Sequence, residues 1–253
     1  MKRIITAAIA IPVVLLITIY SPDWLFAAVI GLVSAAAADE FLSLGERKGI
    51  GRPRRWFLAL PALVAISFLF GSDWIVGSLV GAALLLMSAA VFSGNIEKGL
   101  GTVVVGLSGL LYCSGTLGFL IRMPRPWILL LFAIIWVGDT AAYYGGRALG
   151  RHLLAPIVSP KKTVEGAIAG LAGSVVVGAV CGVWFLHQPL LNMIGISAAT
   201  AIVGQIGDLA ESVLKRSAGV KDSSSILPGH GGILDRLDSL FFATPIFYWL
   251  LNA

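Results

Sequence analysis

The stretch from Asp208 to Asp238 collects the residue types that metal-assisted chemistry uses. Asp235 and Asp238 are three residues apart, so on a helix they point the same way, and Asp208 lies in the apolar segment before them. A few carboxylates, completed by water and substrate phosphate, suit magnesium, and the chain has no Cys and His set with zinc spacing. We therefore predict that these three carboxylates bind Mg²⁺, and we leave open a second, monovalent cation such as K⁺.

Cations and a glycine-rich turn accompany these carboxylates. One polar stripe at helical spacing consists of Asp208, Glu211, Ser212 and Lys215. In the turn that follows, His230 either shapes the chain or contacts substrate, and the glycines either shape the chain or let backbone amides approach phosphate. Carboxylates, cations and such a turn together predict metal-assisted phosphoryl or nucleotidyl transfer. A structural salt-bridge network or an ion pathway is the alternative.

Asp139 is a second polar group in an apolar setting. An aspartate at the centre of a membrane helix costs roughly 2.5–3.5 kcal/mol on insertion scales, so Asp139 should face other helices or a water-filled cavity. Tyr143 lies one helical turn later on the same face. The pair forms either a helix–helix hydrogen bond or the wall of a site. We favour the site because the loop that follows is equally unusual.

That loop contains Ser159-Pro160-Lys161-Lys162-Thr163. Ser159 as N-cap and Pro160 at the first helical position predict that a helix begins here. Lys161, Lys162 and Thr163 then lie in its first turn, where backbone N–H groups favour an anion and disfavour cations. The mismatch predicts a bound phosphate, with membrane-anchoring lysines as the alternative. The P-loop pattern is absent from the sequence.

The composition indicates what must hold these groups. The 253 residues are 58% hydrophobic and 12% charged, against about 25% charged in soluble domains. We predict an all-α, polytopic integral membrane bundle of about nine transmembrane helices. The net charge of +5 does not indicate nucleic-acid binding, because no soluble basic domain is present. The predicted spans are 4–20, 24–39, 56–71, 74–93, 101–121, 127–146, 166–186, 190–213 and 233–252.

The positive charges set the expected orientation. With a cytoplasmic N-terminus and nine spans, sixteen of the 18 lysines and arginines fall on the cytoplasmic side. The long polar loops at 40–55, 147–165 and 214–232 are on that side too, so we expect the active site at the cytoplasmic face of the inner membrane. We treat 1–253 as a single membrane domain, with 1–125 as scaffold, lipid access or dimerisation helices and 126–253 as catalytic. The basic loop at 45–55 either fixes topology or attracts anionic lipid headgroups.

Two groups of motifs resemble the phosphatidate cytidylyltransferases, also called CDP-diacylglycerol synthases. The first comprises Ser212-Val-Leu-Lys215-Arg216, Lys221-Asp222 and His230-Gly-Gly-Ile-Leu-Asp235-Arg236-Leu-Asp238. The second comprises Asp139-Thr-Ala-Ala-Tyr143, Gly146-Arg147 and Ser159-Pro-Lys-Lys-Thr163-Val-Glu165-Gly166. The resemblance covers about 136–240.

The resemblance implies a reaction in which CTP and phosphatidic acid give CDP-diacylglycerol and pyrophosphate with Mg²⁺. It also implies an all-helical membrane enzyme, often a homodimer among membrane lipids. Asp208, Asp235 and Asp238 become the metal carboxylates, and Lys215 a phosphate contact. We take the catalytic set as Lys215, Arg216, Asp235 and Asp238. We take the substrate set as Asp139, Tyr143, Lys161, Lys162, Thr163, Ser212, Lys221, Asp222, His230, Gly231, Gly232 and Arg236.

Three rival functions remain at this stage. A CTP-dependent kinase of an isoprenoid or other lipid alcohol would transfer the γ-phosphoryl group and would need a general base. A CDP-alcohol phosphatidyltransferase would need an Asp-x-x-x-Asp spacing that the sequence lacks. A cation transporter using intramembrane carboxylates gives no account of Lys161-Lys162-Thr163 or of the His-Gly-Gly turn.

Overall fold

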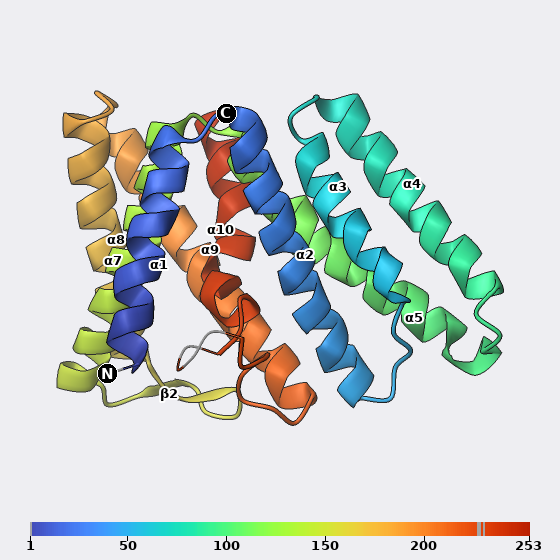
Figure 1. The fold of residues 1–253 in the computed structure, drawn as a ribbon. Coiled ribbons are helices and arrows are strands. Elements are labelled where there is room, and N and C mark those ends of the chain that lie inside the picture. Colours follow the sequence, from blue (N-terminus) through green and yellow to red (C-terminus); the bar gives the residue numbers. More distant parts are fainter. Residues whose placement is uncertain (1, 227–228, 230) are drawn as a thin grey trace. The chain divides into compact units, whose positions relative to one another are not determined.

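A computed structural model of the chain describes residues 2–226, 229 and 231–253, and these form a helical protein (Figure 1). The N-terminal elements are α1 (Lys2–Tyr20), α2 (Asp23–Arg47), η1 (Arg55–Leu58), α3 (Ala59–Ser67), α4 (Ser72–Val91), α5 (Ile96–Gly109), η2 (Leu110–Gly115) and α6 (Phe119–Arg122). The C-terminal elements are α7 (Arg125–Leu149), β1 (Leu153–Ala155), β2 (Ser159–Thr163), α8 (Val164–Trp184), α9 (Leu190–Ser217) and α10 (Leu234–Leu251). The all-α prediction is confirmed, apart from one short ribbon.

Six helical segments of the described chain are long and apolar enough to cross a membrane. They are Asp23–Arg47, Ser72–Val91, Ile96–Arg122, Arg125–Leu149, Val164–Trp184 and Leu190–Ser217. Two further predicted spans correspond to the shorter apolar helices Ala8–Tyr20 and Arg55–Ser67. The ninth corresponds to α10, which carries Asp235, Arg236 and Asp238 in its first two turns. The protein is therefore a polytopic membrane protein by its apolar helices.

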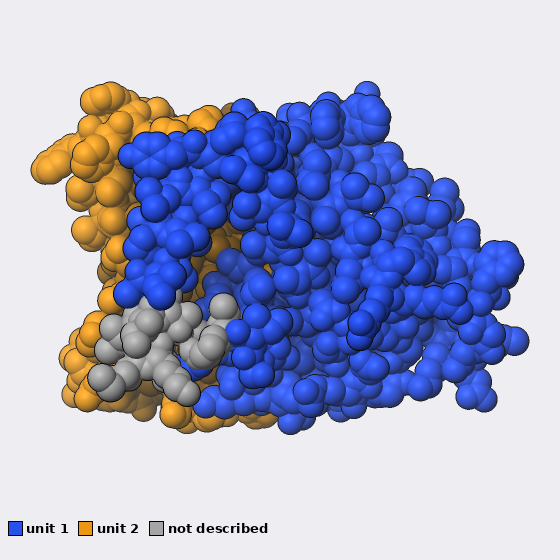
Figure 2. Space-filling model, viewed as in Figure 1, with its two compact units in different colours: residues 1–122, 214–237 blue, residues 123–213, 238–253 orange. Residues whose placement is uncertain are grey.

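The chain folds as two compact units, coloured separately in Figure 2. Unit 1 comprises Met1–Arg122 and Leu214–Leu237, and unit 2 comprises Met123–Val213 and Asp238–Ala253. The first boundary lies near the predicted division at 125/126. However, the 214–237 segment belongs with the N-terminal helices, so most of the predicted catalytic loop is built on the half that we expected to be scaffold.

Unit 1 is organised around α2, which packs against α3 and η2, while α4 packs against α5 (Figure 1). Its buried core includes Leu42 of α2, Phe57 of η1, Val64 of α3, Leu86 of α4 and Leu110 of η2. Because α2 continues to Arg47, Glu40 is inside this helix and not in the loop where we had placed it. The core therefore fixes the position of the Glu40 side chain.

Unit 2 is organised around close packing of α7 on α8. Gly138 of α7 faces Ser174 of α8, and a side chain on Gly138 would collide with the Ser174 hydroxyl. That hydroxyl donates a hydrogen bond to the Ile134 carbonyl at 2.8 Å. Gly145 of α7 similarly faces Ala169 of α8. Small residues at such contacts let membrane helices approach closely, and here they fix the face of α7 that carries Asp139.

The prediction that a helix begins at Ser159 is wrong. Residues Ser159–Thr163 form β2, which pairs antiparallel with β1, and α8 begins at Val164. An extended Ser159 before Pro160 fits an N-cap and a strand equally well, and the pairing of Ser159 with Ala155 and of Thr163 with Leu153 makes it a strand. Thr163 is the N-cap instead, and its hydroxyl accepts a hydrogen bond from the Gly166 amide at 3.1 Å. Lys161 and Lys162 are consequently strand residues, and the argument from a mismatch with the helix dipole no longer applies.

Candidate functional site

Unit 2 contains a cavity of about 520 Å³ that we call the unit 2 cavity. Four segments of the chain contribute to it: α7, the β1–β2 ribbon, the start of α8 and α9. It is lined by Asp139, Ala142, Tyr143, Gly146, Arg147, Leu154, Lys161, Lys162, Thr163, Gly166, Ala167, Gln205 and Asp208. Six of the predicted site residues, which are up to 69 positions apart in the sequence, therefore line one cavity.

The ribbon brings cations to this cavity. Lys161 and Lys162 follow one another on β2, and Lys162 forms an ion pair with Asp208 of α9. The Gln205 side chain, one turn before Asp208, donates a hydrogen bond to the Ala167 carbonyl at 3.1 Å, which ties α9 to α8. A partly buried lysine and aspartate thus meet on a wall that also carries Asp139. The cavity therefore combines positively charged groups with carboxylates.

Glu165 anchors the ribbon to α8. Its Oε2 accepts hydrogen bonds from the backbone amides of Arg151 at 3.0 Å and His152 at 3.2 Å. Its Oε1 lies 2.6 Å from His152 Nδ1. An acidic residue in the first helical turn also interacts favourably with the helix dipole. Glu165, which carried no assigned role beyond its place in the motif, therefore holds the residues just before β1, the strand that pairs with the lysine-bearing β2.

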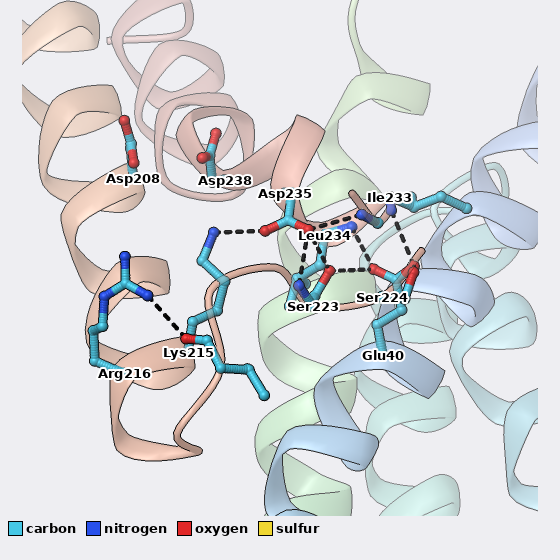
Figure 3. Close-up of polar contacts among 12 residues, drawn as sticks. Glu40, Asp208, Lys215, Arg216, Ser223, Ser224, Ile233, Leu234, Asp235 and Asp238 are labelled. Atoms are coloured by element: carbon cyan, nitrogen blue, oxygen red, sulfur yellow. Dashed lines mark hydrogen bonds and ion pairs between the residues drawn. The ribbon is translucent and has the colours of Figure 1, made fainter. Parts of the chain in front are cut away.

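Unit 1 contains a buried network around Asp235, shown in Figure 3. Lys215 Nζ of α9 donates to Asp235 Oδ1 at 2.6 Å, and both side chains are buried. Asp235 Oδ2 accepts from the Ser223 amide at 2.8 Å, the Ser223 hydroxyl at 2.8 Å and the Gly232 amide at 2.7 Å. The carboxylate of Asp235 thus joins the end of α9, the serine tract and the glycine-rich turn.

Glu40 completes this network, and the sequence did not indicate it (Figure 3). It is only 2% exposed and accepts four hydrogen bonds from the 223–234 segment. The donors are the hydroxyls of Ser223 and Ser224 at 2.8 and 2.7 Å and the amides of Ile233 and Leu234 at 3.0 and 2.8 Å. Glu40 therefore caps the start of α10 from another helix. In the sequence, the signal that could have identified Glu40 was an ionisable residue inside an apolar run that continues past it.

The glycines of the turn are required by this network. Gly231 has φ +80°, and a side chain there would come within 2.5 Å of Asp235 Oδ2. A side chain on Gly232 would collide with the Ser223 hydroxyl and the Glu40 carboxylate. The Gly232 amide donates to Asp235, so in this structure this amide stabilises the turn.

The predicted metal carboxylates belong to both units. Asp208 and Asp238 are in unit 2, where the charges of Asp139, Asp208 and Glu211 act on Asp238, and Asp235 is in unit 1. Within the described part of the chain, no group of three or more His, Cys, Asp or Glu side chains is arranged to hold a metal ion. Joint binding of one ion by all three carboxylates stays a prediction.

The remaining predicted residues have varied environments. Ser212 is buried, whereas Lys221, Asp222 and Arg236 are exposed. Arg216 donates to the Val220 carbonyl at 3.0 Å, which closes the turn after α9. His230 lies outside the described residues. Their predicted contacts with substrate stay predictions.

Comparison with known proteins adds independent information. The model of the cytidylyltransferase family matches residues 1–253. A phosphatidate cytidylyltransferase of Synechocystis sp. is 33% identical, over 99% of this chain and 96% of its own length. Proteins of the same name from Staphylococcus haemolyticus and Staphylococcus aureus are each 36% identical, over 98% and 89% of this chain and 98% and 80% of their own lengths.

Proposed function

The chain belongs to the cytidylyltransferase family, and we propose that it transfers the cytidylyl group of CTP to phosphatidic acid, giving CDP-diacylglycerol and pyrophosphate. The observation that carries the proposal is the unit 2 cavity, where two lysines of β2 and carboxylates of α7 and α9 line one space. The names of relatives that match nearly the whole chain supply the substrate class.

The lipid phosphate is the nucleophile in this proposal. Its second pKa is about 6, so it is mostly ionised at neutral pH and needs no strong general base. An oxygen of this phosphate bonds to the α-phosphorus of CTP while the bond from that phosphorus to the bridging oxygen breaks, and pyrophosphate leaves. The protein's task is to position two polyanions and to offset their repulsion.

Lysine and arginine side chains offset the repulsion between the two substrates. Lys161 and Lys162 line the unit 2 cavity and would contact phosphate oxygens of CTP. An ammonium group has three N–H donors, so Lys215 can hold Asp235 and contact a phosphate oxygen at the same time. Arg216 would neutralise charge on the leaving pyrophosphate or on the lipid phosphate. Asp139 and Tyr143, on the cavity wall, would orient the substrate.

The carboxylates of unit 2 fit a hard divalent cation. The carboxyl groups of Asp139, Asp208 and Glu211 lie close enough to Asp238 to act on it electrostatically. Mg²⁺ typically binds through one or two carboxylates together with substrate phosphates, which does not require a three-residue cluster in the protein alone. Asp208 and Asp238 would hold it, with Asp235 as the third predicted ligand, and K⁺ as a second ion is part of the same proposal. When bound, the ion would neutralise phosphate charge.

The proposal includes a membrane arrangement and an oligomeric state. We propose nine crossings, a cytoplasmic N-terminus, a site at the cytoplasmic face of the inner membrane, and a homodimer. The bias of lysines and arginines supports the orientation. Placement at the membrane surface lets the lipid tails stay in the bilayer while the headgroup reaches CTP.

The test is turnover by the purified full-length protein with phosphatidic acid and CTP labelled at the α- or γ-phosphorus. We expect α-label in the lipid product, γ-label in pyrophosphate, and loss of turnover on chelation that Mg²⁺ restores. Asp238→Asn should lower turnover at least 100-fold at low Mg²⁺, whereas Asp73→Asn at the start of α4 should not. Transfer of γ-label to a lipid alcohol, or ion flux into liposomes without CTP consumption, would contradict the proposal.

A further inference from the structure

Unit 1 contains a cavity of its own, of about 550 Å³, which we call the basic cavity. It is formed by the loop after α2, the end of α4 and the start of α5, and none of its lining residues is among the predicted substrate or metal residues. The residues that matter for the argument are Arg52, Arg54, Trp56, Phe92, Lys98 and Thr102. Its arginines come from the basic 45–55 loop, which the proposed reaction does not use.

The loop is fixed in place from two sides. Gly51 packs against α5 so closely that a side chain there would collide with Thr102 Oγ1. Arg52 donates to Glu46 Oε2 at 3.0 Å and also pairs with Asp39, and both acids belong to α2. Burial lowers the pKa of Arg52, but these acids raise it, and the net pKa is above the usual value. The cavity is therefore built by specific contacts.

The charges of the basic cavity do not cancel. Arg52 pairs with two acids, Asp39 and Glu46, so these three side chains together carry one negative charge. With Arg54 and Lys98 the sum is +1. Arg54 and Lys98 are exposed, and neither side chain forms an ion pair with any acid in the described ranges. Arg54 and Lys98 thus border the same cavity, and neither is paired with an acid in the described part of the chain. A phosphate group has the opposite charge and accepts charge-assisted hydrogen bonds from both arginine and lysine.

The apolar surroundings indicate what the phosphate is attached to. Phe92 is 81% exposed and Ile96 is 97% exposed, both at the turn that joins α4 to α5. Leu100 of α5 and Val91 of α4 are each 77% exposed, and both helices lie in candidate membrane spans. Inorganic phosphate would gain nothing from this surface, whereas a phospholipid would bury its acyl chains against it.

We propose that the basic cavity binds the headgroup of an anionic phospholipid, with Arg54 and Lys98 on the phosphate and the acyl chains along the exposed faces of α4 and α5. The inference depends on the cavity, its charge and its apolar border, and not on the cytidylyltransfer reaction. It assigns a ligand to the N-terminal helices of the enzyme.

The experiment measures equilibrium binding of a short-chain phosphatidylglycerol to the purified full-length protein in a non-ionic detergent. The test variant is Arg54→Gln with Lys98→Gln. The matched control is Arg47→Gln with Lys48→Gln, which removes the same charge from the adjacent exposed end of α2, outside the cavity lining. Short-chain phosphatidylcholine and inorganic phosphate are the other two ligands.

We expect phosphatidylglycerol to bind saturably to the parent protein and to the control, and about tenfold or more weakly to the test variant, because each cation contributes to the attraction. Phosphatidylcholine and inorganic phosphate should bind far more weakly to all three proteins. An equal loss in test and control variants would show diffuse attraction and overturn the proposal. So would unchanged binding by a folded test variant, or inorganic phosphate binding as tightly as the lipid.

Discussion

At the scale of single residues, the Glu40 carboxylate is the feature that most changes our view of the site. It accepts hydrogen bonds from two serine hydroxyls and two backbone amides of the 223–234 segment. The Ser223 hydroxyl lies 2.8 Å from both Glu40 Oε2 and Asp235 Oδ2, and because it has a single proton the two carboxylates share one donor. Asp235 in turn holds Lys215. We infer that Glu40 positions Lys215 without touching the substrate.

Glu40→Gln should therefore impair catalysis by the intact protein. An amide has only one acceptor oxygen, so at least one buried backbone N–H would lose its partner, at a cost of about 1–3 kcal/mol. We expect turnover to fall at least tenfold, with a lower melting temperature and a nearly unchanged KM for CTP. Steady-state kinetics and thermal unfolding in detergent measure the three effects.

The neighbouring residue supplies the control. Asp39 is on the same helix but is partly exposed and pairs with Arg52, away from the 223–234 segment. Asp39→Asn should keep turnover within about twofold, since partly exposed ion pairs contribute little. Wild-type turnover of Glu40→Gln would show that the network is not needed to position Lys215.

The unit 2 cavity leads to a specific prediction for Lys162. Lys162→Met keeps the aliphatic chain but removes the charge that pairs with Asp208. If Lys162 contacts a CTP phosphate, kcat/KM for CTP should fall about 100-fold, as for other lost charge-stabilising groups. Initial rates over a range of CTP concentrations test this. The exposed Arg151→Gln, just outside the cavity lining, should change kcat/KM by less than threefold, and equal effects would point to a loss of overall charge.

At the scale of elements, the β1–β2 ribbon is the unexpected feature. A helix starting at Ser159 would have placed the lysines in its first turn, whereas the ribbon presents them to the unit 2 cavity from a strand. Three interactions fix it: Thr163 caps α8, the backbone amides of residues 151 and 152 donate to Glu165, and the two strands pair. A short ribbon on its own is marginally stable, so these anchors matter.

Glu165→Ala should loosen this ribbon. It removes the acceptor for the backbone amides of Arg151 and His152, which then lose their side-chain partner. We expect faster proteolysis between residues 150 and 160 and a KM for CTP raised several-fold, with helix content unchanged. Limited proteolysis followed by mass spectrometry locates the cleavage. Glu97→Ala, in the first turn of α5, is the control and should leave both readouts unchanged. A ribbon that stays protease-resistant would contradict the anchoring role.

At the scale of the whole molecule, the number of crossings is the main prediction to test. Single cysteines replace Ser93, between α4 and α5, or Gln188, between α8 and α9, in a chain with Cys113 and Cys181 changed to Ala. With nine crossings and a cytoplasmic N-terminus, a membrane-impermeant thiol reagent should label position 188 in intact cells and position 93 only after lysis. The reverse pattern would invert the topology. Labelling of both positions in intact cells would require a different number of crossings.

The sequence by itself determined the class of protein and the chemistry. A 58% hydrophobic chain with repeated long apolar runs is predicted to be a helical membrane protein, because a helix satisfies its own backbone groups within lipid. The spacing of Asp208, Lys215, Asp235 and Asp238 within one segment already indicated phosphate chemistry. Both conclusions depend on local composition and spacing, which a single sequence contains.

The tertiary structure decided which distant groups meet. Glu40 precedes Ser223 by 183 positions, and nothing in either local pattern predicts their hydrogen bond. Likewise, Lys162 of the ribbon and Asp208 of α9 are 46 positions apart, and only the packing of the ribbon and α9 brings them together. The ribbon itself depends on pairing with β1 and on the contacts of Glu165, so local capping rules placed the helix start too early. Long-range contacts depend on how the helices pack, and helix packing is a property of the whole fold.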